Sequence, residues 1–229
     1  MASLAATASS STALAIYEVP TAATPMHLPE RRYDLGSGEV VVAQRWGAAG
    51  TGAAQWHAGV MLARLVDREG PDIWRGLRVL ETGAGGGALV AIAALRAGAD
   101  YVATDADANV FGLLEENLAR NVGDLSKYRG TAQLRWGDDV AGAVAALGGP
   151  PDVVLAADVI FPGTRDAWPD FFECLKALGA RRTLLAYTIR YVKDDALFFR
   201  GLRKAGLTAV RLEADGASSS IYEIVLPAA

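Results

Sequence analysis

The chain has only one cysteine, Cys174, and two histidines among its 229 residues. A single cysteine excludes an intrachain disulfide and is typical of a protein that works in a reducing compartment. Structural zinc sites draw their ligands mainly from cysteine and histidine, so this composition leaves such a site almost without ligands. We therefore expect no metal centre and a cytoplasmic location.

Long apolar runs and basic clusters are also lacking. Charged residues such as Arg96 interrupt each apolar stretch before it reaches the ~20 residues that span a bilayer. The net charge is −4, from 22 basic and 26 acidic residues, and no Lys/Arg cluster of the kind that tracks phosphates is present. The sequence predicts neither a membrane nor a nucleic-acid partner.

The first 29 residues contain no lysine or arginine, since the first basic residue is Arg31. The stretch from Met1 to Ala15 is rich in alanine, serine and threonine, as organelle transit peptides are, but such peptides are also rich in arginine. We interpret residues 1–29 as a flexible tail, with organelle targeting as the alternative. Residues 30–229 are expected to form a single domain that begins with a β-hairpin over 33–45.

What the chain does have is a regular alternation of apolar strands and amphipathic helices. The last two strands have no helix between them and must form a hairpin, so one strand runs antiparallel to the others. The pattern predicts an α/β three-layer sandwich with a seven-stranded, mostly parallel sheet. Strands are expected at 77–81, 100–105, 131–136, 152–158, 183–189, 207–212 and 220–226, and helices at 56–67, 88–95, 107–118, 165–178 and 194–205.

A glycine turn follows the first of these strands. The strand ends in Glu81, and Gly83 and Gly85 then remove side chains where the backbone must turn tightly and a ligand must come close. Asp105 ends the next strand, about 20 residues beyond the turn, where an acidic residue usually holds a ribose hydroxyl. The unit is therefore interpreted as a nucleotide-type ligand site.

The turn leaves three alternatives open. Gly83, Gly85 and Ala88 fit the dinucleotide pattern G-x-G-x-x-A, which would indicate NAD, and the turn could also serve packing alone. Glu81 favours a different ligand, because its carboxylate would repel a pyrophosphate. S-adenosylmethionine carries an ammonium and a sulfonium and no phosphate, so this methyl donor is the preferred cofactor.

Five segments, in this order, resemble the methyltransferase-like 21 family of protein-lysine methyltransferases, which belong to the class I, seven-β-strand methyltransferases. They are Gly52–Trp56, Val79–Gly87, Leu134–Gly137, Leu155–Phe161 and Leu184–Arg190. The resemblance implies the Rossmann-like methyltransferase fold, S-adenosylmethionine as cofactor and a partner protein as substrate. It also implies that Trp56 lies against the donor and that Trp136 borders its adenine.

The glycine turn and the resemblance together give the expected site. The cofactor-binding residues are Trp56, Glu81, Gly83, Ala84, Gly85, Asp105, Trp136 and Ala157, and the catalytic residues are Asp158 and Phe161. Asp158 would orient a lysine amine, and Phe161 would wall its channel. Four of the site residues also have a structural interpretation. Asp105 could cap a helix, Trp56 and Trp136 could be core aromatics, and Asp158 could be a buried, hydrogen-bonded acid.

The chain departs from the family pattern at three positions. Thr82 and Gly86 stand where leucine and threonine are usual, and Phe161 replaces the tyrosine of the D-x-x-Y motif. We expect methyl transfer to a lysine of a partner protein by a monomeric enzyme. The alternatives are a small-molecule methyltransferase and a non-catalytic protein that binds S-adenosylmethionine on the same fold.

Overall fold

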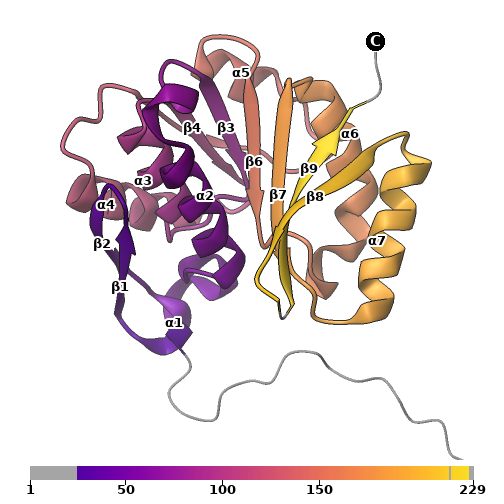
Figure 1. Cartoon of the computed structure of the whole chain (residues 1–229), viewed down its shortest axis with the longest axis horizontal. Helices are drawn as coiled ribbons and strands as arrows, with labels where there is room; N and C mark the ends of the chain where they lie inside the picture. Colours follow the sequence, from indigo (N-terminus) through magenta and orange to yellow (C-terminus); the bar gives the residue numbers. More distant parts are fainter. Residues whose placement is uncertain (1–24, 217, 227–229) are drawn as a thin grey trace, which may run out of the picture.

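A twisted seven-stranded sheet forms the middle of the computed structural model, which describes residues 25–216 and 218–226 (Figure 1). Strand β9 is antiparallel to β7 and β8, and the other neighbouring pairs are parallel, as the sequence predicts. In spatial order the strands are β5 (Tyr128–Gln133), β4 (Asp100–Asp105), β3 (Arg78–Thr82), β6 (Val153–Ala157), β7 (Arg182–Thr188), β9 (Ser219–Val225) and β8 (Thr208–Ala214).

Helices cover both faces of the sheet and bury one hydrophobic core on each (Figure 1). Successive side chains of a strand point to opposite faces, so Val79 of β3 joins one core and Leu80 joins the other. The first face carries α2 (His57–Trp74), α3 (Leu89–Arg96) and α4 (Phe111–Asn121), and the second carries α5 (Ala141–Leu147), α6 (Trp168–Leu178) and α7 (Val192–Lys204). This is the predicted three-layer sandwich.

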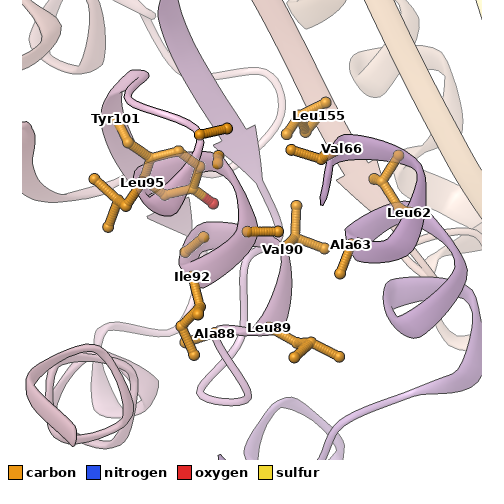
Figure 2. Packing of buried hydrophobic residues seen from close by; sticks show 14 of the residues in the cluster. Leu62, Ala63, Val66, Ala88, Leu89, Val90, Ile92, Leu95, Tyr101 and Leu155 are labelled. Carbon is orange, nitrogen blue, oxygen red and sulfur yellow. The ribbon is translucent and has the colours of Figure 1, made fainter. Parts of the chain in front are cut away.

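Small side chains let α3 pack closely on its neighbours. Every residue from Leu89 to Leu95 is buried. Figure 2 shows Val90 of α3 and Ala63 of α2 in the same core cluster as Leu155 of β6. Because the start of α3 lies close to the end of β3, the connection between them must be a tight turn, and this connection is the glycine turn.

A separate two-stranded sheet precedes the main one. Strands β1 (Glu30–Leu35) and β2 (Gly38–Ala43) pair antiparallel, which confirms the predicted hairpin. Two short helices, α1 (Trp46–Ala49) and a 3-10 turn at Gly50–Ala53, then lead to α2. Of the predicted tail, only residues 25–29 are described, and two of their carbonyls accept hydrogen bonds from the Gln44 side chain.

Some predicted boundaries are wrong. The strand predicted at 131–136 is β5, which lies three residues earlier, because this edge strand is only half-buried and lacks a strong apolar pattern. Helix α5 was not predicted, since its sequence AGAVAAL has no polar face. The helix predicted from Arg165 starts as a 3-10 turn, Pro162–Ala167, before α6.

Within the described ranges, no helix has the length and apolar character needed to cross a membrane.

Candidate active site

The glycine turn after β3 has the backbone conformation that the sequence predicts. Gly83 has φ 69° and Gly85 has φ 59°, which lie in the left-handed region. A Cβ on Gly83 would lie 2.4 Å from Val159 Cγ1, and one on Gly85 would lie 2.8 Å from the Gly52 carbonyl oxygen. Side chains are therefore excluded at both positions by conformation and by space.

The amides of this turn are already used within the protein. Three successive amides donate hydrogen bonds: Ala84 to the Thr104 carbonyl (2.9 Å), Gly85 to Asp105 Oδ2 (2.9 Å) and Gly86 to the Gly52 carbonyl (2.7 Å). A pyrophosphate site needs such amides to point at the phosphate oxygens. The occupied amides and the two nearby carboxylates argue against NAD and suit a cationic ligand.

A cavity of about 600 Å³, here called the main cavity, opens beside this turn at the carboxyl ends of the parallel strands. Its volume lies within the range of ~300–1,000 Å³ that is usual for ligand and cofactor sites. All of the predicted site residues line it: Trp56, Glu81, Gly83, Ala84, Gly85, Asp105, Trp136, Ala157, Asp158 and Phe161. The structure therefore brings together residues that lie up to about a hundred positions apart in the sequence.

Glu81 is the buried carboxylate of the main cavity. It is 3% exposed and accepts a hydrogen bond from the Tyr101 hydroxyl. Burial raises the pKa of Glu81 to about 8, because the charged form loses its water. A ligand cation beside Glu81 would favour the ionised form, which is the chemistry expected for the ammonium and sulfonium of S-adenosylmethionine.

Asp105 braces the glycine turn from the end of β4. Its Oδ2 accepts from the Gly85 amide and its Oδ1 from the Asp107 amide, both at 2.9 Å. Burial raises the pKa of Asp105, against the lowering effect of these hydrogen bonds. The capping role falls to Asp107, whose side chain accepts from the Asn109 amide. Asp105 is therefore not the helix cap; it braces the glycine turn and lines the main cavity.

The two predicted tryptophans are fixed by their ring nitrogens. Trp136 Nε1 donates to Thr82 Oγ1 at 2.8 Å, and its ring packs against Phe171 with centroids 4.7 Å apart. The threonine that departs from the family pattern thus positions the tryptophan. Trp56 Nε1 donates to the Thr51 carbonyl at 2.9 Å. Both rings have defined orientations at the cavity wall.

Asp158 lies just past β6 in an unusual backbone conformation. It has φ 56°, a region that non-glycine residues rarely adopt, and its side chain is 2% exposed. The Thr188 amide donates to Asp158 Oδ1 at 3.1 Å, and Arg190 Nη1 lies 3.0 Å from the same oxygen. Local strain of this kind is common at functional sites, where surrounding contacts hold it. The carboxylate is buried and paired, yet still lines the main cavity.

Phe161 lies three residues after Asp158 and lines two cavities. They are the main cavity and a small pocket of about 10 Å³ that Tyr187 and Asp194 also line. The Phe161 amide donates to Thr164 Oγ1 at 3.2 Å, which fixes the backbone at the start of the 3-10 turn. The ring therefore supplies an apolar wall without a hydroxyl.

Sequence reasoning missed two residues that line the main cavity, Arg190 and Gln55, and one that supports the glycine turn, Asn117. Arg190 pairs with Asp158; Gln55 Nε2 donates to the Trp56 carbonyl at 3.2 Å; and Asn117 Nδ2 donates to the Gly86 carbonyl at 2.8 Å. The usable signs were an arginine at the carboxyl edge of an apolar strand and an asparagine on the buried face of α4. Among the described residues, no group of three or more His, Cys, Asp or Glu side chains is placed to hold a metal ion.

The fold and the cavity define the class of protein. The ribosomal protein L11 methylase from Lactobacillus delbrueckii subsp. bulgaricus has the same fold, with a TM-score of 0.52 and 20% identity over 75% of this chain and 80% of that chain. The 16S rRNA N2 G1207 methyltransferase of T. thermophilus, in complex with AdoMet and guanosine, gives a TM-score of 0.59. Its identity to this chain is 17%, and the match covers 86% of this chain and 50% of that chain. The chain therefore has the Rossmann-like methyltransferase fold.

The family follows from sequence. The model of the lysine methyltransferase family matches residues 36–205, and the chain belongs to this family. It is 29% identical to the protein N-lysine methyltransferase METTL21A of Danio rerio, over 76% of this chain and 78% of that protein. It is 30% identical to the EEF1A lysine methyltransferase 3 of Mus musculus, over 78% and 74%. The protein is a protein-lysine methyltransferase, and S-adenosylmethionine is its methyl donor.

Proposed function

We propose that the main cavity binds the methyl donor at its Glu81–Asp105 side and receives a lysine side chain of a partner protein beside Asp158 and Phe161. One observation carries the proposal: a single cavity joins a glycine turn with two carboxylates to a separate buried carboxylate beside an aromatic ring. The first group of residues suits a cationic nucleoside, and the second suits an amine that becomes a cation.

Residues at the donor side would hold the cofactor by charge and shape. Glu81 would face the cationic part, Asp105 would accept from the ribose hydroxyls, and Trp136 would lie along the adenine. Ala84 and Ala157 would lie against the ligand, because their short side chains leave room. Trp56 would close the cavity from the start of α2.

S-adenosylmethionine supplies an electrophilic methyl group on a positively charged sulfur. The lysine first loses a proton to solvent, and its nitrogen lone pair then forms the N–C bond while the C–S bond breaks. The electron pair of that bond leaves with the sulfur, so the positive charge moves to the nitrogen. The protein chiefly aligns the two reactants, which can supply ~7–11 kcal/mol of the barrier reduction.

Asp158 would act on the nitrogen as it gains charge. A preorganised carboxylate that accepts a hydrogen bond from the amine becomes more favourable as positive charge develops there. Phe161 would wall the channel and offer its ring face to the forming cation. The family tyrosine would add a hydroxyl, so this chain would rely on the carboxylate and the ring alone.

The test uses Asp158→Asn with tritiated S-adenosylmethionine and cell lysate as acceptor, and it counts label in methyl-lysine after hydrolysis. We expect turnover to fall a hundredfold or more, about 2.7–4 kcal/mol in the barrier, while donor affinity by calorimetry is unchanged. Asp124→Asn, a fully exposed acid in a loop, is the matched control and should behave as wild type.

Two results would contradict this assignment. Normal turnover in Asp158→Asn would show that Asp158 has only a structural role. A loss of donor affinity that matches the loss of activity would show that Asp158 binds the donor instead of the lysine. Phe161→Tyr, which restores the family hydroxyl, should remain active. If label reached no lysine at all with the wild-type protein, the proposed acceptor would be wrong.

We also propose a monomer without a nucleic-acid partner that works in the cytoplasm. Support comes from the net charge of −4, the absence of basic clusters and the single cysteine. Sedimentation of the full chain and the location of a fluorescent fusion test these points. Plastid or mitochondrial fluorescence that is lost when residues 1–24 are removed would favour targeting instead.

A further inference from the structure

Arg190 places a fixed positive charge at the acceptor end of the main cavity. It is the second residue after β7, and its side chain is 21% exposed. Its Nη1 lies 3.0 Å from Asp158 Oδ1 and 3.3 Å from the Thr188 carbonyl oxygen. The guanidinium carbon lies 5.3 Å from the centre of the Trp56 ring. Three elements therefore hold this one guanidinium.

Other charged groups around the pair mostly have partners of their own. In the small pocket, Asp194 pairs with Arg165, and Asp195 accepts from the Tyr187 hydroxyl. The remaining titratable or charged groups that line the two cavities are Glu81, Asp105, Asp107, Arg135 and Tyr191, and His57 next to Trp56 pairs with Asp215. Arg190 is the cation in direct contact with Asp158.

A buried carboxylate alone would oppose the chemistry. An opposite charge within ~4–6 Å stabilises the charged form of a group and shifts its pKa by ~1–3 units. Free lysine already has a pKa of ~10.4, and an unpaired Asp158 would raise that value further. The lysine would then keep its proton, and an ammonium has no lone pair with which to attack.

We propose that Arg190 is a positioning residue that neutralises Asp158, so that the carboxylate can accept a hydrogen bond from the lysine amine without holding it in the ammonium form. The inference rests on the proposed role of Asp158. The Asp158–Arg190 pair has no net charge, yet its carboxylate keeps lone pairs for the amine. The contact with Trp56 fixes the guanidinium on the side of α2, so that it does not swing into the channel.

The pH dependence of the rate distinguishes this role from a purely structural one. Initial rates of tritiated methyl-lysine formation, with cell lysate as acceptor, would be measured across the pH range below ~10.4. In Arg190→Met, the unpaired Asp158 carboxylate should hold the lysine in its ammonium form up to a higher pH. The acid limb of the rate profile should therefore move up by about one pH unit or more. Arg190→Lys keeps the charge and should keep the limb near wild type.

Asp158→Asn should move the limb the other way. It leaves Arg190 unpaired beside the amine, so the limb should fall to lower pH while the rate at the plateau drops. Opposite shifts in the two variants are the expected result. The acid limbs of the pH–rate profiles could instead be the same in wild type and Arg190→Met while Asp158→Asn is still slow. That result would overturn the role of Arg190 and leave the role of Asp158 intact.

A second measurement needs no protein acceptor. Isotope-labelled n-butylamine mimics the lysine side chain, and with S-adenosylhomocysteine bound its NMR shift reports the pKa of the bound amine. That pKa should be lower in wild type than in Arg190→Met, or than in Arg190→Gln if the methionine variant is unstable. Equal values would overturn the inference, and failure of the amine to bind any variant would contradict the acceptor site itself.

Discussion

At the scale of single residues, the site depends on carboxylates that are held in three different ways. Glu81 is buried with one hydroxyl donor, Asp105 accepts two backbone amides, and Asp158 faces an arginine. Burial disfavours a charge, and each kind of partner offsets that cost to a different degree. The three acids are therefore held in the same cavity by three different kinds of contact.

Glu81 predicts a pH dependence of donor binding. Its pKa of about 8 in the free protein means that it holds a proton at neutral pH, and a cationic ligand favours the ionised form. Binding therefore lowers that pKa, releases a proton, and becomes tighter as pH rises toward 8. Calorimetry in buffers of different ionisation enthalpy measures the number of protons released on binding. The range from roughly pH 6 to pH 7.5 is used because the donor's own α-amino group titrates above it.

The control for that measurement is Glu81→Gln, which keeps an acceptor for Tyr101. It should bind the donor more weakly and with little proton release. Proton release equal to wild type in this variant would assign the titration to another group.

Asp105 predicts a loss of donor affinity by two routes that can be separated. Asp105→Ala removes the ribose acceptor and the brace on the Gly85 amide, at a cost of ~1.5–3 kcal/mol in binding. Asp105→Asn keeps one oxygen for that amide and should lose less. Titration calorimetry with S-adenosylmethionine measures both. Wild-type affinity in a folded Asp105→Ala protein would remove Asp105 from the ribose site.

At the scale of elements, α4 joins the hairpin to the glycine turn. Asn117 Oδ1 accepts from the Ala43 amide at 2.7 Å, and its Nδ2 donates to the carbonyls of Ala43 (3.1 Å) and Gly86 (2.8 Å). Asn121, one helical turn later, bonds only the hairpin at this interface, through the amide and carbonyl of Val41. One asparagine thus serves the site and the hairpin, and the other serves the hairpin.

This difference gives a matched pair of variants. Asn117→Ala and Asn121→Ala should each reduce the free energy of unfolding by ~1–3 kcal/mol, because buried backbone groups lose their partners. Only Asn117→Ala should also weaken S-adenosylmethionine binding. Denaturant unfolding and calorimetry provide the two measurements. Equal donor affinities in the two variants would show that Asn117 does not support the turn.

The sequence predicts best those elements whose side chains meet a buried sheet. Strands β3, β4 and β6 lie close to their expected positions, because apolar runs that end in Glu81, Asp105 and Asp158 leave little choice of register. The half-buried edge strand β5 and the small helix α5 carry no such pattern and were misplaced or missed.

The same reason explains what was found and missed in the site. Residues that follow directly from strand ends and the glycine turn, such as Glu81 and Gly85, could be named from the sequence. Arg190 and Asn117 could not, because their roles depend on partners 32 and 31 residues away in the chain. Contacts of that kind depend on how strands and helices are placed side by side, which local patterns do not encode.

At the scale of the whole molecule, donor binding should stabilise the fold. A ligand at a hundred times its Kd adds ~2.7 kcal/mol to the free energy of unfolding. For a domain of this size, that corresponds to a rise in Tm of roughly 5–10 °C. S-adenosylmethionine should produce this shift in a thermal scan, and NAD should not. A comparable shift with NAD would contradict the donor assignment.

The attachment of the hairpin to α4 also sets an order of events on the ribosome. The bonds from Asn117 to Ala43 and from Asn121 to Val41 join residues 74 and 80 positions apart, so β2 leaves the exit tunnel well before its partner helix has been made. Val40 and Val42, which are fully buried in the finished protein, have no α4 to cover them during that interval. The hairpin, although it is synthesised early, can therefore dock on α4 only late.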